Sequence, residues 1–417
     1  MELTIQQPCP ACGAEITLNE DDRLVRCAFC DVVNFRVQQR LPRYTLAARL
    51  PSHVAVDELL YIPYLRFKGC IYYCQGGQVR HKLVDTTRVG CAAGTLPVSL
   101  GLRPQAMKVL PVTEQRGGGY VRQSVKAEQI FTEAARITML YEKENKNRRL
   151  HRAFIGETVS RIYLPAYLYN DMLYDGISHR NIGTASVAEE LSGQLIPFNT
   201  EWEPRFISTH CPACGDVMQG ARETLVMLCG NCETQWLEEQ GRFIRLDCQT
   251  VTALEDSARY LPFWQIEPFV TGYQLATFAD FLRLTNQPVV IRPQHQARSL
   301  SFIVPAFKMN PSQFLQAAKA LTVLQDSLQP GGEQRLDPGS AYPVTLSHSE
   351  AVEALKSILA ASAVSVKKVM EILPSLSFTA QKKRLIYLPF RDAGHDCIQH
   401  QTGVSISTAA LRFGRKL

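Results

Sequence analysis

Eight of the thirteen cysteines fall into two sets with the same spacing. In each set, two C-x2-C pairs are separated by fourteen residues. Two thiolates of one C-x2-C turn can point at one metal ion, and two such turns complete a tetrahedron. The spacing therefore predicts two four-cysteine metal sites. The first set is Cys9, Cys12, Cys27 and Cys30, and the second is Cys211, Cys214, Cys229 and Cys232.

Structural zinc is the chemistry that these two sets favour. Four thiolates satisfy a tetrahedral Zn²⁺ ion and leave no open position for water, which argues against catalytic zinc. A rubredoxin-like iron site uses the same ligands and stays open as an alternative. A thioredoxin-like redox pair would need a βαβ context, and disulfides are disfavoured in an intracellular protein. We therefore expect two structural zinc ions, one in each set.

Residues 7–38 and 209–246 resemble the zinc-ribbon superfamily. Gly13 and Gly215 follow the second cysteine of each set, where such a turn often needs a positive φ. The resemblance implies a zinc ion held by four cysteines on a small β-hairpin scaffold. It implies no single activity, because zinc ribbons occur in transcription, replication, ribosomal and adaptor proteins. The remainder resembles uncharacterised bacterial double-zinc-ribbon proteins through Leu164-Pro165, Cys211-Pro-Ala-Cys214-Gly215 and Leu388-Pro389-Phe390.

Five cysteines lie outside the two sets. Cys70 and Cys74 are four residues apart in a strand-like stretch, so their side chains would share one face. We interpret them as small buried hydrophobic side chains. The alternative is a third metal or redox site that includes Cys91 or His81. The five are Cys70, Cys74, Cys91, Cys248 and Cys397.

Length and composition indicate an ordinary globular protein of several domains. At roughly 150 residues per domain, 417 residues predict two to three domains. A hydrophobic fraction of 46% and a charged fraction of 20% exclude a largely disordered chain and a coiled coil. No window approaches the ~18 uncharged apolar residues of a membrane span, and no secretory signal is visible at the start. We therefore expect a soluble, cytoplasmic protein.

The net charge gives little support for a nucleic-acid partner. The formal charge is +6 with every cysteine counted as neutral. A four-thiolate zinc site has a net charge of −2, so two sites lower +6 to about +2. A charge this small does not indicate a surface dominated by phosphate contacts.

The two cysteine sets begin similar stretches of chain. Cys9 and Cys211 differ by 202 positions. An aromatic strand with a proline follows each set, and these prolines, Pro63 and Pro262, differ by 199 positions. Because proline cannot donate to a β-ladder, each motif is typical of an edge strand, a strand start or a bulge. We expect an internal duplication in which each zinc ribbon precedes a mainly β unit with a few amphipathic helices.

The predicted fold class is therefore α+β, with four domains along the chain. Residues 1–45 form the first zinc ribbon and 46–200 the first α+β domain. Residues 201–250 form the second ribbon and 251–417 the second α+β domain.

Helix signals are clearest in the second half of the sequence. Asn310 precedes Pro311, which places a capping residue before a proline suited to the first helical turn. Ser347 and Glu350 form a capping box before an apolar stripe. A third helix is predicted between about Ser124 and Tyr141. Strands are predicted at Leu385–Arg391 and Leu411–Phe413.

No familiar catalytic motif is present in the sequence. Phosphate-binding glycine loops, H-E-x-x-H and G-x-S-x-G are all absent. His395 and Asp396 offer an acid–base pair beside Cys397, although a turn-stabilising role is the better interpretation. We therefore predict that the protein is not an enzyme and has no catalytic residue.

Two classes of function remain. The first is a zinc-binding adaptor or scaffold that mediates protein–protein interaction with an unidentified partner. The second is a nucleic-acid-associated factor of replication or transcription type. A basic run from Lys143 to Arg152 would serve phosphate contacts, but Glu142 and Glu144 dilute it. We interpret the run as a solvated helix end and favour the adaptor.

Overall fold

Strand is the commoner regular structure in the computed structural model, which contains about 39% strand and 22% helix. The fold is therefore α+β, as predicted. The residues that the structure describes are 3–39, 41–92, 94–114, 117–140, 151–253, 258–328 and 336–414.

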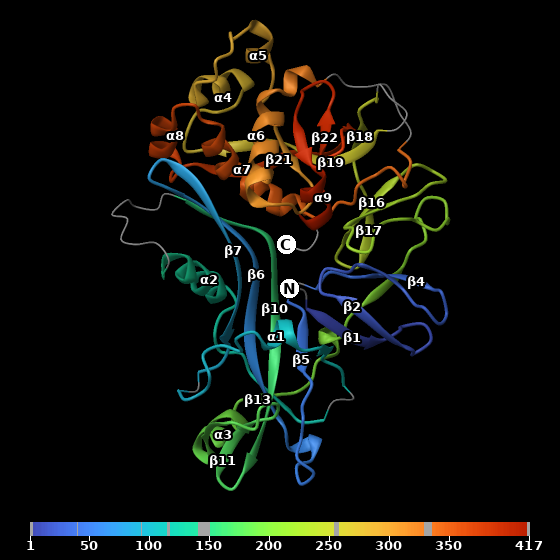
Figure 1. The fold of residues 1–417 in the computed structure, drawn as a ribbon, viewed down its shortest axis with the longest axis vertical. Coiled ribbons are helices and arrows are strands. Elements are labelled where there is room, and N and C mark those ends of the chain that lie inside the picture. The colour runs from blue at the N-terminus through green and yellow to red at the C-terminus, as the bar shows by residue number, and fades with distance from the viewer. Residues whose placement is uncertain are drawn as a thin grey trace. The chain divides into compact units, whose positions relative to one another are not determined.

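The chain divides into two compact units, which Figure 1 shows as ribbons. Each unit contains one of the two cysteine sets. The first unit comprises Met1–Lys68, Val84–Lys143 and Glu157–Ser208. The second comprises Gly69–Leu83, Glu144–Gly156 and Thr209–Leu417.

The first cysteine set lies among four short strands. The strands β1 (Thr4–Pro8) and β2 (Glu15–Asn19) form an antiparallel hairpin at the edge of a large sheet. The strands β3 (Leu24–Arg26) and β4 (Val33–Arg36) form a second hairpin, which β14 (Phe206–Ser208) extends. The ligand cysteines lie in the turns of these two hairpins, so the strands fix the turns that hold the thiols.

The large sheet has the strand order β13-β9-β6-β10-β5-β8-β1-β2; in addition, β7 pairs with β6, and the β11–β12 hairpin pairs with β10 through β11. Its remaining strands are β5 (Arg43–Leu46), β6 (Leu60–Gln75), β7 (Gln78–Val89), β8 (Val109–Pro111), β9 (Gly119–Val121), β10 (His151–Tyr169), β11 (Met172–Asp175), β12 (Asn181–Thr184) and β13 (Leu195–Ile196). The accompanying helical segments are η1 (Val56–Glu58), α1 (Arg103–Ala106), α2 (Gln129–Leu140), α3 (Ala185–Ser192) and η2 (Thr200–Trp202).

The second unit has its own cysteine-bearing module and its own sheet; we call each cysteine set with its neighbouring hairpin strands a ribbon. Its ribbon contains the antiparallel strands β15 (Val226–Leu228), β16 (Gln235–Glu239) and β17 (Arg242–Arg245). Its main sheet has the order β20-β19-β21-β22-β23, and β18 pairs with β21. These strands are β18 (Cys248–Thr250), β19 (Arg259–Thr271), β20 (Phe302–Pro305), β21 (Ser377–Asp392), β22 (Asp396–Gln399) and β23 (Ser405–Ser407). The helical segments are α4 (Phe278–Thr285), α5 (Pro293–Ala297), α6 (Pro311–Val323), η3 (Gln325–Ser327), α7 (His348–Ser362), α8 (Val366–Ile372) and α9 (Thr408–Gly414).

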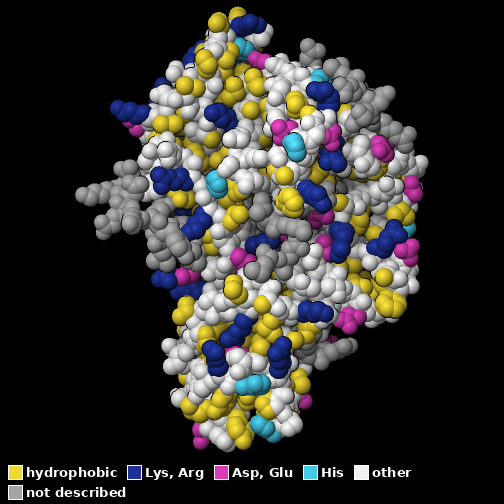
Figure 2. Space-filling model, viewed as in Figure 1, with side chains coloured by type: hydrophobic (Ala, Val, Ile, Leu, Met, Phe, Trp, Pro, Cys, Tyr) yellow, Lys and Arg dark blue, Asp and Glu magenta, His cyan; other side chains and the backbone are white. Residues whose placement is uncertain are grey.

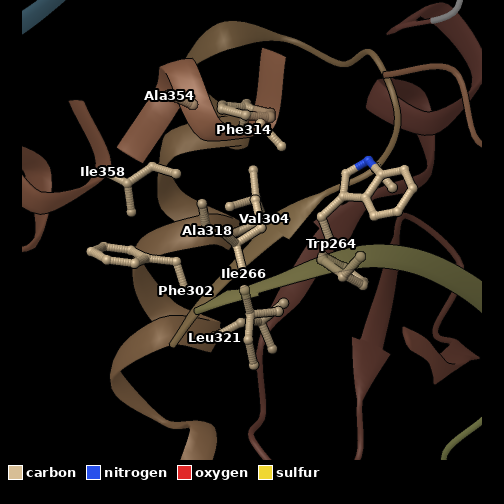
Figure 3. Packing of buried hydrophobic residues seen from close by; sticks show 14 of the residues in the cluster. Trp264, Ile266, Phe302, Val304, Phe314, Ala318, Leu321, Ala354 and Ile358 are labelled. Atoms are coloured by element: carbon tan, nitrogen blue, oxygen red, sulfur yellow. The ribbon is translucent and has the colours of Figure 1, made fainter. Parts of the chain in front are cut away.

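Two helices cover the core of the second sheet. Figure 3 shows side chains of β19 and β20 facing those of α6 and α7. The Trp264 side chain is fully buried, and its indole N–H donates to the Leu346 carbonyl at 2.9 Å, so its polar group is satisfied. The labelled residues are Trp264, Ile266, Phe302, Val304, Phe314, Ala318, Leu321, Ala354 and Ile358.

The two capped helices are confirmed. The Asn310 side chain accepts a hydrogen bond from the Ser312 N–H at 3.0 Å and begins α6. The Ser347 hydroxyl accepts from the Glu350 N–H, and the Glu350 carboxylate accepts from the Ser347 N–H at 3.0 Å, which completes the capping box of α7. Both helices start where the capping residues predict, because a cap satisfies N–H groups that have no partner within the helix.

Other element predictions need correction. The predicted strand at Leu411–Phe413 is wrong, because these residues lie in α9. In a strand, Leu411 and Phe413 would share one face, but Leu411 is 1% exposed and Phe413 is 60% exposed. The helix predicted from Ser124 begins later, at Gln129, and Tyr141 lies outside the described residues. The strand at Leu385–Arg391 is confirmed within β21.

Candidate metal centres

The structure brings the eight predicted cysteines into two groups of four. Within each group all four sulfur atoms lie within 4.8 Å of one another. In the first group, Cys9 and Cys30 are 3.9 Å apart between sulfurs, and Cys12 and Cys27 are 3.7 Å apart. Four sulfurs that surround one Zn²⁺ ion at about 2.3 Å lie roughly 3.8 Å from each other. The first group therefore already has the dimensions of a tetrahedral thiolate site.

The second group is slightly tighter. Its sulfur–sulfur distances are 3.5 Å between Cys211 and Cys232 and 3.4 Å between Cys214 and Cys229. One cysteine of each group is exposed and two are buried, so each site lies at the surface of its ribbon. Thiolate sulfur is a soft ligand that suits zinc and iron in tetrahedral geometry. Both groups can therefore bind a metal ion.

The first C-x2-C turn of each ribbon depends on a glycine. The Gly13 N–H donates to the Cys9 carbonyl at 2.9 Å, and the Gly215 N–H donates to the Cys211 carbonyl at 2.9 Å. Gly13 has φ 78° and Gly215 has φ 79°. A Cβ atom at either position would meet nothing within 4 Å, so these turns require glycine for its backbone conformation.

The second C-x2-C turn repeats this plan without glycine. The Asp31 N–H donates to the Cys27 carbonyl at 3.0 Å, and the Glu233 N–H donates to the Cys229 carbonyl at 3.0 Å. Asp31 has φ 58° and Glu233 has φ 60°. Non-glycine residues rarely adopt this conformation, and both ribbons adopt it at the same point of the turn.

Backbone N–H groups also polarise the thiols. The Ala11 N–H points at the Cys9 sulfur and the Phe29 N–H at the Cys27 sulfur, each at 3.4 Å. Hydrogen bonds from the N–H groups of Cys30 and Phe29 lower the pKa of Cys27 to about 6. A thiol must lose its proton to bind a metal, so these N–H groups favour the thiolate form.

The second site has a side-chain hydrogen bond to a cysteine that the described residues do not provide at the first site. The Thr234 hydroxyl lies 2.9 Å from the Cys232 sulfur, and the Trp236 indole N–H donates to the same hydroxyl at 2.8 Å. Because the indole can only donate, the hydroxyl hydrogen is left for the sulfur. The residues 202 positions earlier, Val32 and Asn34, supply no hydroxyl beside Cys30.

We expect Thr234→Val to release metal faster from the second site, by about tenfold, since losses of this size follow removal of a hydrogen bond to a metal ligand. Transfer of metal to a chromogenic chelator would measure the two release phases. Val32→Thr is the matched control, because no indole orients the new hydroxyl and release should change less than about twofold. Unchanged release from Thr234→Val would show that the hydroxyl does not stabilise the bound metal.

The cysteines outside the two sets do not form a further group among the described residues. Cys70 and Cys74 lie in β6 with exposures of 6% and 0%, so their interpretation as buried side chains is confirmed. Burial raises the pKa of each thiol to about 12, which disfavours the thiolate form that binds metal. Cys91 and Cys397 are also buried.

His395 and Asp396, interpreted from the sequence as a turn-stabilising pair, lie where β22 begins. The His395 carbonyl accepts hydrogen bonds from the N–H and the hydroxyl of Thr408, both at 2.9 Å, which joins this turn to α9. The His395 side chain is exposed, and Asp396 is partly exposed. Of the basic run, residues 143–150 lie outside the described residues.

No family model, curated protein or solved structure matches the chain. Among the described residues, no helix is both long enough and apolar enough to cross a membrane. The interpretation of the two sites therefore depends on the spacing of the cysteines and on the geometry of their sulfurs.

Proposed function

We propose that the protein is a non-catalytic adaptor in which two structural zinc ions stabilise modules that bind protein partners. The observation that carries this proposal is the four-sulfur geometry of both sites. Four thiolates complete the coordination of Zn²⁺, so neither ion would retain a position for a substrate or for water. Cys9, Cys12, Cys27 and Cys30 hold the first ion, and Cys211, Cys214, Cys229 and Cys232 hold the second.

The adaptor consists of two copies of one plan, each a ribbon followed by a mainly β unit. Strand pairing in the two units supports this duplication. In the first unit β5 runs parallel to β10, with Arg43 opposite Arg161. In the second unit β18 runs parallel to β21, with Cys248 opposite Leu385. Each short strand directly follows its ribbon. Each longer partner contains a Tyr-Leu-Pro sequence, Tyr163-Leu164-Pro165 in β10 and Tyr387-Leu388-Pro389 in β21.

Hydrogen bonds at Pro63 and Pro262 also support the internal duplication. The Pro63 carbonyl accepts from the Gly90 N–H at 2.7 Å, and the Pro262 carbonyl accepts from the Ala306 N–H at 3.0 Å. The Gly90 carbonyl in turn accepts a hydrogen bond from the Ser124 N–H, and the Ala306 carbonyl accepts one from the Thr345 N–H. The same sequence of contacts at equivalent strands is expected of a duplicated unit.

An open strand edge in the second unit can serve partner binding. Residues 379–384 of β21 are exposed. On the side away from β19, β21 pairs with β18 and β22 only from Leu385 onward, and no described strand pairs with the earlier residues. Such an edge can accept an extended segment of a partner through backbone hydrogen bonds.

Surface character also favours a protein partner. Phe29, in the second turn of the first metal site, is 79% exposed. On the face shown in Figure 2, hydrophobic, basic and acidic side chains are interspersed. Aromatic and mixed surfaces suit protein recognition, whereas nucleic-acid binding favours a continuous basic surface.

The experiment combines metal analysis with partner capture. Protein purified without added metal should contain close to two zinc ions per chain, and the zinc-loaded chain should capture a specific protein from its native host. Folded protein with iron in place of zinc, or without metal, would contradict the structural-zinc proposal. A substrate turned over by the wild type but not by folded His395→Ala would contradict the non-catalytic role.

The second candidate function is a nucleic-acid-associated factor, to which the resemblance to zinc ribbons lends support. Its test is the salt dependence of binding to DNA or RNA. Salt-sensitive affinity that falls when Lys146, Arg148 and Arg149 are replaced by alanine would favour this function over the adaptor.

A further inference from the structure

Two arginine side chains of the first unit lie opposite each other on neighbouring strands. Arg43 of β5 is paired with Arg161 of β10 in a parallel register. Arg161 is only 8% exposed, and Arg43 is partly buried. Burial lowers the pKa of Arg43, and the neighbouring charge of Arg161 lowers it further. Two like charges therefore share a site with little access to water.

No acidic side chain of the described residues forms an ion pair with either arginine. Within the described part of the chain, no carboxylate lies within 4.0 Å of either guanidinium group. The groups that oppose the lowering of the Arg43 pKa are the Tyr163 hydroxyl, through a hydrogen bond, and the exposed carboxylate of Glu201. The Nε atoms of both arginines are buried without a hydrogen-bond partner. Buried charges are normally paired, and the two guanidinium groups form no ion pair with the described residues.

Aromatic rings fix the two guanidinium groups. Arg43 lies over the Trp202 ring at 4.8 Å, and Arg161 lies over the Tyr163 ring at 6.0 Å. Arg161 also donates to the Tyr163 hydroxyl at 3.2 Å. Tyr120 contacts both rings, with centroid distances of 5.0 Å to Tyr163 and 5.5 Å to Trp202. Stacking on Trp202 leaves the N–H edge of Arg43 accessible, whereas Arg161 uses one N–H group for the Tyr163 hydroxyl and keeps its remaining N–H groups for an anion.

The second unit shows that the strand pairing itself needs no arginine. In the equivalent parallel pair, Cys248 lies opposite Leu385. Tyr387 follows Leu385 by two residues, as Tyr163 follows Arg161. The same pairing is thus formed without arginine, so the parallel pairing of these strands does not by itself require Arg43 and Arg161.

We infer that Arg43 and Arg161 form a binding site for a phosphate group, free or as the ester of a small molecule. Guanidinium groups bind phosphate through paired, charge-assisted hydrogen bonds, and the negative charge would offset the repulsion between the arginines. The site uses none of the eight cysteines of the metal centres and does not depend on the adaptor function. Its residues come from β5, β10 and η2, so a bound phosphate would also join these elements.

Inorganic phosphate is the first probe, tested on zinc-loaded full-length protein at constant ionic strength. Phosphate should raise the unfolding temperature in a saturable way, because a ligand of the native state stabilises it by mass action. Calorimetric titration should give an affinity that falls by about tenfold or more in Arg43→Cys and in Arg161→Leu. These substitutions introduce the side chains found at the equivalent positions of the second unit. The exposed Arg180→Gln is the control and should leave the affinity unchanged.

A second measurement covers the case in which phosphate has no effect. In phosphate-free buffer, both variants should unfold at or above the wild-type temperature, since each relieves a repulsion. If phosphate does not raise the unfolding temperature of the wild type, and both variants unfold at a lower temperature than the wild type, the arginines are structural. This result would contradict the proposed phosphate site. A phosphate effect that persists in both variants would also overturn it. Tighter binding of phenyl phosphate than of inorganic phosphate would identify an ester as the ligand.

Discussion

Replacing Cys27 with serine should remove one metal ion and unfold the first ribbon. The Cys27 side chain is 1% exposed and belongs to the same buried cluster as Cys9, so the metal site and the ribbon core are continuous. Binding of structural zinc to a four-ligand site contributes about 10–16 kcal/mol at neutral pH, which exceeds the stability of a small module. Metal analysis should show a fall from two zinc ions to one per chain.

Two further variants serve as controls for the metal content of Cys27→Ser. Cys229→Ser removes the equivalent ligand of the second site and should also leave one zinc ion. Cys70→Ser changes a buried cysteine outside both sites and should leave both ions in place. If Cys27→Ser retained two zinc ions, the four-thiolate assignment of the first site would be wrong.

Replacing Arg66 with methionine should produce the largest loss of stability away from the metal sites. Arg66 is fully buried in β6, and its guanidinium group contacts the carboxylates of Glu20 and Asp85, with two contacts of 2.9 Å to Asp85. Burial alone would lower the pKa of Arg66, but these two carboxylates raise it. Without the arginine, two carboxylates would remain close together and poorly solvated, at a cost of about 3–5 kcal/mol.

Urea unfolding would measure this loss against an exposed ion pair. Arg26 and Asp31 lie 2.9 Å apart with side-chain exposures of 67% and 80%. Arg26→Gln should therefore cost no more than about 1 kcal/mol, because water already solvates both charges. Equal losses for Arg66→Met and Arg26→Gln would mean that the buried network does not stabilise the first unit.

The metal sites were predictable because their signal is local. The spacing of Cys9 and Cys12 fixes one turn, and the repeat of the whole pattern 202 positions later gives independent support. The start of α6 was predictable for the same reason, since Asn310 caps a helix whose first residue is the adjacent proline. In each case the residues that determine the structure lie within a few positions of one another.

Features that depend on long-range pairing could not be predicted in this way. Arg43 and Arg161 are 118 positions apart, and only the parallel pairing of β5 with β10 brings them together. The prediction for Leu411–Phe413 failed because three residues cannot distinguish a strand from the end of a helix. The Thr234 hydrogen bond did have a local signal in the sequence. Thr234 lies two residues after Cys232 and two residues before Trp236.

The division of β6 and β10 between the two units affects how the protein can fold during its synthesis. Residues 69–75 of β6 and 151–156 of β10 belong to the second unit. Their side chains Tyr72 and Ile155 are buried in its core, where Tyr72 lies 6.0 Å from Phe314 between ring centroids. Because a ribosome translates Tyr72 long before Phe314, these apolar strand ends emerge before the residues of the second unit against which they pack. These ends of β6 and β10 therefore cannot reach their final packing until most of the second half has been made.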